Sequence, residues 1–384
     1  MNARKSVPIV LKHRSDMNTK TGSKLHNRVK KGADGRERTG DSVKDTKDSP
    51  IDRDRPVKAF QKQAFLHFVQ DCFEQGIPGL LKRYETEIKP FTPQYATRVA
   101  FDQNMDKNRY KDVICIDETR VILGEAGDYI HANRVEGEPL VNRFICSQAP
   151  MIKTVKDFWR MVVQEKVSNI FMLCETIEEN RPKCEQYWPR DVGCAMEWPG
   201  IAVRNVGIDD EDTTTIQTTL EIVHKKQKMT VKHHLWRTWP DKSVPHSVMA
   251  PFRLLKIARW ATGPTIVHCS AGIGRTGTVV GLELAIQTAL VGKELKMVEI
   301  VQKLRTMRGQ AVQTDLQFVY MHKSILSYLQ AHKVYGDNPT LMQKSAQFDH
   351  EYAGLLKNRE AGADQMYSPV VPLNMRKAAT PTKS

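Results

Sequence analysis

The sequence predicts an α/β fold with a central twisted, mostly mixed β-sheet flanked by helices. Apolar runs of strand length are interspersed with longer stretches at helical spacing, an order typical of a sheet covered by helices. The apolar run 264–267 leads through a glycine-containing turn into the apolar stretch 276–291, the pattern of a strand, a tight loop and a buried helix. Hydrophobic residues make up 40% of the 384 residues, which permits a substantial core.

The elements follow from local patterns along the chain. Apolar positions at helical spacing in 59–69 mark the start of the folded domain. Strands are expected at 113–116, 129–135, 143–146 and 169–173, with a helix over 157–163. Two further strands are expected within 200–236. The remaining helices are expected at 247–262, 276–291, 296–308 and 315–329.

Composition divides the chain into a basic N-terminal tail (1–57), a folded domain (58–335) and a C-terminal extension (336–384). Residues 1–58 carry 16 Lys and Arg against 8 Asp and Glu, within a net charge of +14 for the chain. The tail has no aromatic residue and few apolar clusters, so we expect it to be disordered, and the extension to be largely disordered. The tail is either a solvated extension or the binding site for an anionic partner, a nucleic acid or a membrane surface.

The cysteines and the apolar segments indicate the compartment. Seven cysteines, without CxxC pairs or zinc-like spacing, fit reduced thiols in an intracellular protein and predict no metal site. We expect no secretory signal and no transmembrane segment, because no apolar run is long enough and uninterrupted. A cytoplasmic location is expected, with nuclear access through the basic tail.

The stretch His268–Thr276 combines a nucleophile with an anion-binding turn. A strand that enters a helix through such a turn aims backbone N–H groups and the helix N-terminus at one point. Gly272 and Gly274 let the backbone curl tightly, and Arg275 can bind a phosphate with two hydrogen bonds. The same positive field favours the thiolate form of Cys269 near neutral pH. A buried small residue beside an ordinary turn is the simpler interpretation, but a His-Cys pair followed by this arginine is rare by chance.

A second motif, Arg237–Asp241, supplies a carboxylate. Asp241 follows Trp239 and Pro240, so a bulky indole and a rigid ring would let the loop move as a unit and carry the acid over a bound substrate. A covalent mechanism through a cysteinyl-phosphate needs such a general acid, and later a base that activates water.

Together these motifs resemble the classical, phosphotyrosine-specific protein-tyrosine phosphatases of the non-receptor type, with a single catalytic domain. Further motifs of that family match in the same order and extend the resemblance over about residues 80–330: 107–113, 128–133, 148–150, 157–159, 183–189 and 313–317. The resemblance implies the cysteine phosphatase fold for 58–335. It also implies hydrolysis of phosphotyrosine in proteins, without metal or other cofactor.

The resemblance also implies residue roles. Cys269 would attack phosphorus, Arg275 and the loop amides would hold the phosphate oxygens, and Asp241 would be the general acid and then the base. Gln313, supported by Gln317, would position the hydrolytic water. The loop amides are those of Ser270, Ala271, Gly272, Ile273 and Gly274. Two neighbours would act on the sulfur: Thr276 would hydrogen-bond the thiolate, and His268 would stabilise it through the loop, a role compatible with a buried structural histidine.

Four other residues would shape the cleft. Tyr110 would stack on the substrate ring and deepen the substrate cleft (the slot), so that the shorter phosphoserine side chain could not reach Cys269. Asp112 would hold the peptide backbone of the substrate. Glu178 and Lys183 would steady Arg275 and the loop of Trp239 and Pro240, unless they are ordinary surface charges.

The chain departs from the family pattern at Lys242 and Ser243, where a ring and a glycine are usual. Losing the glycine should stiffen the loop that carries Asp241 (the acid loop) or shift the equilibrium between its open and closed states. A catalytically weak phosphotyrosine-binding scaffold (a pseudophosphatase) is therefore the alternative function. His131 for asparagine and Ala149 for glycine look structural, and Gln310 would either narrow the cleft or contact the water.

Overall fold

The computed structural model describes residues 58–124, 127–225, 227–240 and 243–361. Predictions for 1–57 and 362–384, and for Asp241 and Lys242, lie outside these residues. In the described ranges, none of the helices has both the length and the apolar character needed to cross a bilayer.

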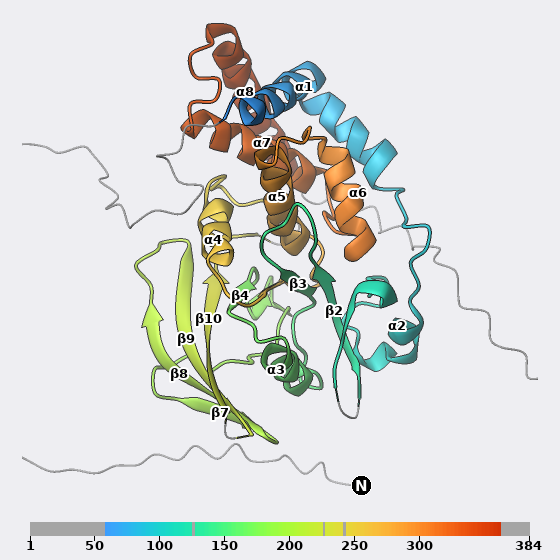
Figure 1. Cartoon of the computed structure of the whole chain (residues 1–384), viewed down its shortest axis with the longest axis vertical. Coiled ribbons are helices and arrows are strands. Elements are labelled where there is room, and N and C mark those ends of the chain that lie inside the picture. Colours follow the sequence, from blue (N-terminus) through green and yellow to red (C-terminus); the bar gives the residue numbers. More distant parts are fainter. Residues whose placement is uncertain (1–57, 125–126, 226, 241–242, 362–384) are drawn as a thin grey trace, which may run out of the picture. The chain divides into compact units, whose positions relative to one another are not determined.

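The described strands form a nine-stranded mixed sheet in the order β1-β2-β3-β11-β4-β10-β9-β8-β7 (Figure 1). The neighbours β3, β11, β4 and β10 are parallel, and the outer pairs are antiparallel. The strand bounds are β1 Arg120–Ile122, β2 Tyr129–Val135, β3 Phe144–Ser147, β4 Asn169–Met172, β7 Ala195–Trp198, β8 Ile201–Asp209, β9 Thr215–His224, β10 Gln227–Trp236 and β11 Thr265–His268. A separate hairpin pairs β5 (Ile177–Glu178) with β6 (Arg181–Pro182). The prediction of a central mixed sheet is confirmed.

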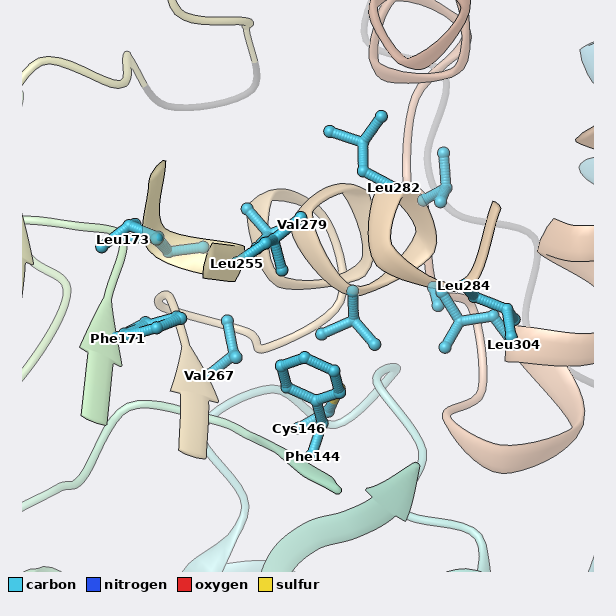
Figure 2. Packing of buried hydrophobic residues seen from close by; sticks show 14 of the residues in the cluster. Phe144, Cys146, Phe171, Leu173, Leu255, Val267, Val279, Leu282, Leu284 and Leu304 are labelled. Carbon is cyan, nitrogen blue, oxygen red and sulfur yellow. The ribbon is translucent and has the colours of Figure 1, made fainter. Parts of the chain in front are cut away.

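Helix α5 (Arg275–Leu290) lies at the centre of the core. It is apolar around most of its surface and buried over most of its length, as expected of a helix enclosed by other elements. Figure 2 shows side chains of β3, β4 and β11 gathered beneath it. The other long helices are α1 Ala59–Arg83, α3 Val155–Gln164, α4 Ala250–Arg259, α6 Met297–Met307, α7 Asp315–Ala331 and α8 Pro339–Ala361. Helices α1, α4, α6 and α7 contact α5, and α3 lies against β8.

Short helical turns complete the fold: η1 Tyr84–Ile88, α2 Val99–Gln103, η2 Met105–Lys107 and η3 Asp117–Thr119. Turn η1 is a π-helix that directly follows α1. π-Helical turns are rare in proteins, and many of those that occur are at functional sites.

Residues 113–116 are buried but do not form a strand, so the prediction of a strand there is wrong. Side chains, in place of a neighbouring strand, satisfy their backbone groups. Gln310 Oε1 accepts from the Ile114 N–H at 3.2 Å, His131 Nε2 bonds the Val113 carbonyl at 2.8 Å, and Asn133 Nδ2 donates to the Ile116 carbonyl at 2.8 Å. Burial alone does not separate the two cases. Residues 200–236 also differ, because they hold three strands where two were expected.

The C-terminal extension was expected from residue 336 and largely disordered, but its first part is helix α8. Phe348 and Tyr352 are buried, and α8 contacts α1 and α7. Leu341, Phe348, Tyr352, Leu355 and Leu356 recur at helical spacing, a signal that the prediction of disorder overlooked. The folded domain therefore continues to at least residue 361.

Candidate active site

The loop 269–274 joins β11 to α5 at the centre of the sheet, where β11 lies between β3 and β4. Cys269 directly follows the strand and is 5% exposed. Its Sγ accepts a hydrogen bond from the Gly272 N–H at 3.2 Å. The loop therefore curls around the sulfur, as the sequence motif predicts.

Gly272 cannot be replaced without moving the loop. Its φ is +72°, a conformation that favours glycine. A Cβ at this position would lie 2.1 Å from the Ser147 carbonyl oxygen at the end of β3. The second glycine, Gly274, has Gln313 Oε1 and Gln317 Nε2 each 3.0 Å from the place of its missing Cβ.

Arg308 lies beneath the loop and was not predicted as a site residue. It is fully buried, donates from Nε to the Gly272 carbonyl at 2.9 Å and from Nη2 to the Ala271 carbonyl at 3.0 Å. Its Nη1 bonds Asn133 Oδ1 at 2.8 Å and His131 Nδ1 at 3.2 Å. By holding the carbonyls on one side of the loop, Arg308 fixes the plane of the peptide groups that carry its N–H groups. No short motif links Arg308 to a loop 36 residues earlier.

Burial and the Arg308 charge lower the pKa of His131 to about 3, so its ring is neutral at physiological pH. A neutral ring can accept from Arg308 at Nδ1 while it donates to the Val113 carbonyl from Nε2. The histidine that replaces the usual asparagine is therefore structural, as expected from the sequence.

Arg275 begins α5 and is held by Glu178 of β5. Two hydrogen bonds join them, Nη1 to Oε1 at 2.7 Å and Nη2 to Oε2 at 2.9 Å, and Nη1 also donates to the Leu173 carbonyl at 2.9 Å. Glu178 is therefore not an ordinary surface charge. Lys183 is 8% exposed, and its carbonyl accepts from Ser270 Oγ at 3.0 Å.

Tyr110 is brought to the loop by a hydrogen bond of 2.8 Å between its hydroxyl and Ser270 Oγ. Its segment is tied to residues 148–150, since Gln148 Oε1 accepts from the Arg109 N–H at 2.9 Å and the Ala149 N–H donates to the Ser270 carbonyl at 3.0 Å. Asp112 is exposed, and no hydrogen bond among the described residues joins it to the loop.

Gln313 and Gln317 lie together at the start of α7. Gln317 Oε1 accepts from the Gln313 N–H at 3.0 Å, and the Thr314 side chain caps the helix through the Gln317 N–H at 3.2 Å. The preceding residue, Val312, has φ +60°, which is a strained conformation for a β-branched side chain. Gln310 also has a positive φ (+62°), and its side chain is buried and bonded to the Ile114 N–H.

Two residues absent from the sequence predictions support this strained segment. Tyr84 of η1 donates to the Gln313 carbonyl at 2.5 Å and lies 3.2 Å from the Val312 carbonyl. The buried Arg305 donates to the carbonyls of Ala311 at 2.9 Å and Val312 at 3.0 Å. Tyr84 and Arg305 are far apart in the sequence, and the fold brings both of them to this segment.

His268 is fully buried in a hydrogen-bonded series with Tyr187 and His233. The Tyr187 hydroxyl lies 2.7 Å from His268 Nε2 and 2.9 Å from His233 Nε2, and His268 Nδ1 lies 3.3 Å from the Cys269 carbonyl. We assign the proton of His268 to Nδ1, because a carbonyl can only accept. Burial lowers its pKa to about 4, so His268 is a neutral donor at neutral pH.

Thr276 is fully buried one residue after Arg275. Within the described part of the chain, its Oγ1 has no hydrogen-bond partner. A buried hydroxyl without a partner is costly, which is typical of a group reserved for a ligand or a reaction step.

The loop that carries the predicted acid is anchored by Trp239. Its ring is 2% exposed, packs against Trp236 and Tyr320, and donates from Nε1 to the Ser243 carbonyl at 3.0 Å. Pro240 is exposed at the end of the described part of this loop. Asp241 lies outside the described residues, so its distance from Cys269 is not part of the site geometry.

Positive charge at the site comes from arginine and backbone dipoles. Among the residues that the structure describes, no group of three or more His, Cys, Asp or Glu could hold a metal ion. The arrangement is a thiol at the start of a tight turn, a guanidinium fixed at the start of the helix that follows, and a glutamine pair next to Gly274.

Comparison with known proteins gives this arrangement a family. Residues 104–327 match the family model of protein-tyrosine phosphatase. Rat tyrosine-protein phosphatase non-receptor type 9 is 35% identical over 249 residues, covering 59% of this chain and 42% of that protein. Human receptor-type tyrosine-protein phosphatase C is 34% identical over 271 residues, covering 67% of this chain and 20% of that protein.

The structure is similar to the catalytic domain of human protein tyrosine phosphatase non-receptor type 18, with a TM-score of 0.59 and 27% identity, covering 71% of this chain and 99% of that chain. This chain spans less than half the length of the curated relatives named above. Both receptor and non-receptor proteins are among the relatives, so the non-receptor assignment stays a prediction. The family match covers more than half of the chain, which therefore belongs to the protein-tyrosine phosphatase family.

Proposed function

We propose that this chain hydrolyses phosphotyrosine in proteins through a cysteinyl-phosphate intermediate. The observation that carries the proposal is the position of Cys269 Sγ inside its loop. The Gly272 N–H points at the sulfur at 3.2 Å, and Arg275, at the start of the helix that follows the loop, is fixed by two hydrogen bonds to Glu178. A phosphate bound by this turn would have its phosphorus in contact with the nucleophile.

In the first step the Cys269 sulfur attacks phosphorus and the bond from phosphorus to the tyrosine oxygen breaks. Asp241 donates its proton to that oxygen, so tyrosine leaves as a neutral phenol. Arg275 and the amides of 270–274 hold the other phosphate oxygens, whose charge they stabilise in the transition state.

In the second step a water attacks phosphorus, the bond from sulfur to phosphorus breaks, and inorganic phosphate and the Cys269 thiolate are formed. Gln313, with Gln317 in support, positions the water, and Asp241 accepts its proton. Thr276 donates a hydrogen bond to the departing thiolate, a role supported by its buried hydroxyl without a described partner. His268 donates to the Cys269 carbonyl and keeps the loop in shape.

Substrate selection would depend on the depth of the slot. Tyr110 is hydrogen-bonded to Ser270 of the loop and would stack on the ring of the substrate tyrosine. The exposed Asp112 would bind the peptide backbone of the substrate. The short side chain of phosphoserine would not reach the sulfur. Glu178 and Lys183 would act through Arg275 and the acid loop.

The test is phosphate release from a phosphotyrosine peptide by wild type, Cys269→Ser and Asp241→Ala under reducing conditions, with a phosphoserine peptide alongside. We expect turnover of phosphotyrosine alone, none with Cys269→Ser and a strong reduction with Asp241→Ala. Folded wild type that binds the phosphopeptide without releasing phosphate would contradict the proposal. It would identify a binding module, and Lys242 and Ser243 would be the positions to restore.

We also propose that the enzyme acts in the cytoplasm and that residues 1–57 bind an anionic partner. All seven cysteines are free, which fits a reducing compartment. Deletion of 1–57 should leave kcat/KM unchanged and remove binding to anionic vesicles or nucleic acid. Unchanged binding after the deletion would exclude the tail as the binding site.

A further inference from the structure

Helix α8 lies antiparallel to α7, and two ion pairs join them, one at the middle of α7 and one at its first residue. Asp349 Oδ1 lies 2.8 Å from Lys323 Nζ, and ten residues later Arg359 Nη2 pairs with Asp315 Oδ2. Tyr352, between these two positions, and Phe348, next to Asp349, are both buried. Figure 1 shows α8 beside α1 and α7 at the end of the described chain.

The ion pair of Arg359 reaches the segment that carries Gln313. Asp315 is the first residue of α7, two positions after Gln313, and is 19% exposed. Its other oxygen, Oδ1, accepts from the Leu316 N–H at 2.7 Å. Arg359 therefore holds a carboxylate that is itself bonded into the first turn of α7.

This turn fixes Gln313 from one side. Gln317 Oε1 accepts from the N–H groups of both Gln313 and Thr314, at 3.0 and 3.3 Å. On the other side the backbone passes through Val312 at φ +60°, a strained conformation that persists only where the surroundings hold it. Tyr84 and Arg305 support the Val312 side, and Arg359 is the contact from α8 on the α7 side.

We propose that Arg359 is a positioning residue for the breakdown of the phosphoenzyme. This inference rests on the proposed function of Gln313. Arg359 would hold the start of α7 so that Gln313 directs water onto the cysteinyl-phosphate. Phosphorus then gains a bond to the water oxygen and loses its bond to sulfur, and the water proton passes to Asp241. Formation of the intermediate does not use Gln313, so it does not depend on Arg359.

The expected effect is limited by the exposure of the pair. Arg359 is 40% exposed, and ion pairs of this kind have modest energies. Arg359→Ala should slow breakdown of the phosphoenzyme by up to about fivefold. The rate of its formation should be unchanged, so the intermediate accumulates to a higher level.

The experiment uses the full chain and an aryl phosphate whose phenol absorbs light. Release of phenol in the first turnover gives the rate of formation, and release of inorganic phosphate gives the rate of breakdown. The matched control is Asp349→Ala, which removes a second ion pair between the same two helices, two turns further along α7. Urea denaturation of both variants measures any loss of stability.

We expect Arg359→Ala to slow phosphate release but not phenol release, and Arg359→Lys to restore most of the rate. Asp349→Ala should change neither rate. In a Gln313→Ala background, Arg359→Ala should have no further effect on breakdown, because both residues act on the same water. Equal rates in Arg359→Ala and wild type, equal effects of Arg359→Ala and Asp349→Ala, or additive losses with Gln313→Ala, would overturn the inference.

Failure of the proposed function has a different signature. Phenol release by Cys269→Ser, or no turnover by wild type, would remove the phosphoenzyme itself. Normal behaviour of both proteins, together with an Arg359→Ala variant that matches its control, would remove only the role of Arg359.

Discussion

Replacing Gly272 by alanine tests whether the shape of the loop around Cys269 is required for the reaction. The substitution adds one methyl group at a residue with φ +72°. The backbone conformation alone costs an alanine roughly 1–2 kcal/mol. The added Cβ would also lie 2.1 Å from the Ser147 carbonyl oxygen, where an ordinary contact begins at 3.4 Å.

That overlap cannot be relieved by rotating a side chain, because both atoms belong to the backbone or are fixed to it. The loop must move away from β3 by about 1 Å, and a displacement of this size at a reacting centre can lower the rate by about 100-fold. The Gly272 N–H would leave the Cys269 sulfur, and the carbonyls bonded to Arg308 would shift with it. We expect kcat/KM for a phosphotyrosine peptide to fall at least about 100-fold.

The matched control is Gly200→Ala in the turn between β7 and β8. Gly200 has φ +84°, and a Cβ there has nothing within 4 Å. It incurs the same backbone cost without the overlap, so the control should lose stability and keep its kcat/KM. Both variants are assayed for peptide turnover and for urea denaturation. A Gly272→Ala enzyme within about tenfold of wild type would refute the reasoning that the loop has no room for a side chain.

Three further predictions concern ionisable side chains of the interior. Glu178→Gln should lower kcat/KM about tenfold, since an amide cannot accept both hydrogen bonds from Arg275. The control is Glu179→Gln, at the neighbouring exposed position, which should have the kcat/KM of wild type. Equal kcat/KM values in the two variants would contradict the role of Glu178. Arg308→Met should lower the free energy of unfolding by about 3 kcal/mol or more in urea denaturation, because hydrogen bonds from charged groups contribute roughly 1.5–3 kcal/mol each; a loss below 1 kcal/mol, on the order of one neutral hydrogen bond, would contradict it. The third prediction concerns acid. Burial lowers the pKa values of four histidines from 6.5 to about 3 or 4; they are His131, His234, His268 and His322. Below pH 6.5 the unfolded chain therefore binds more protons than the folded one, and the free energy of unfolding decreases as the pH is lowered. Between pH 7 and 5.5 we expect a loss of about 5 kcal/mol in the free energy of unfolding, and an unchanged urea midpoint would show that these rings are not held neutral.

The centre of the site could be predicted because its parts are close in the sequence. A strand, a loop with two glycines and a helix follow one another within 264–291, so local patterns place Cys269 and Arg275 together. The prediction that Glu178 steadies Arg275 came from the family resemblance, and the two hydrogen bonds between them agree with it.

The supporting residues could not be predicted in the same way. Arg308 reaches the loop carbonyls across 36 residues, and Tyr84 reaches Gln313 across 229. Nothing in the residues around either one distinguishes it from an ordinary buried or surface side chain. Such contacts depend on how helices pack, which local periodicity does not determine.

The two errors in secondary structure have different causes. Residues 113–116 have the apolar character of a strand, but three side chains from elsewhere bond their backbone groups. Helix α8 was missed although apolar residues from Leu341 to Leu356 recur at helical spacing, because the polar residues between them were given more weight. It is stabilised by packing on α1 and α7.

The central claim is that Cys269 carries the phosphoryl group during the reaction. Wild-type enzyme is mixed with a phosphotyrosine peptide, quenched in acid within the first turnover and digested, and the peptide containing Cys269 is weighed by mass spectrometry. The account predicts a phosphate on that peptide, at a higher level in Gln313→Ala and absent from Cys269→Ser. Continued turnover by an enzyme whose Cys269 peptide never carries phosphate, in wild type and in Gln313→Ala, would contradict it.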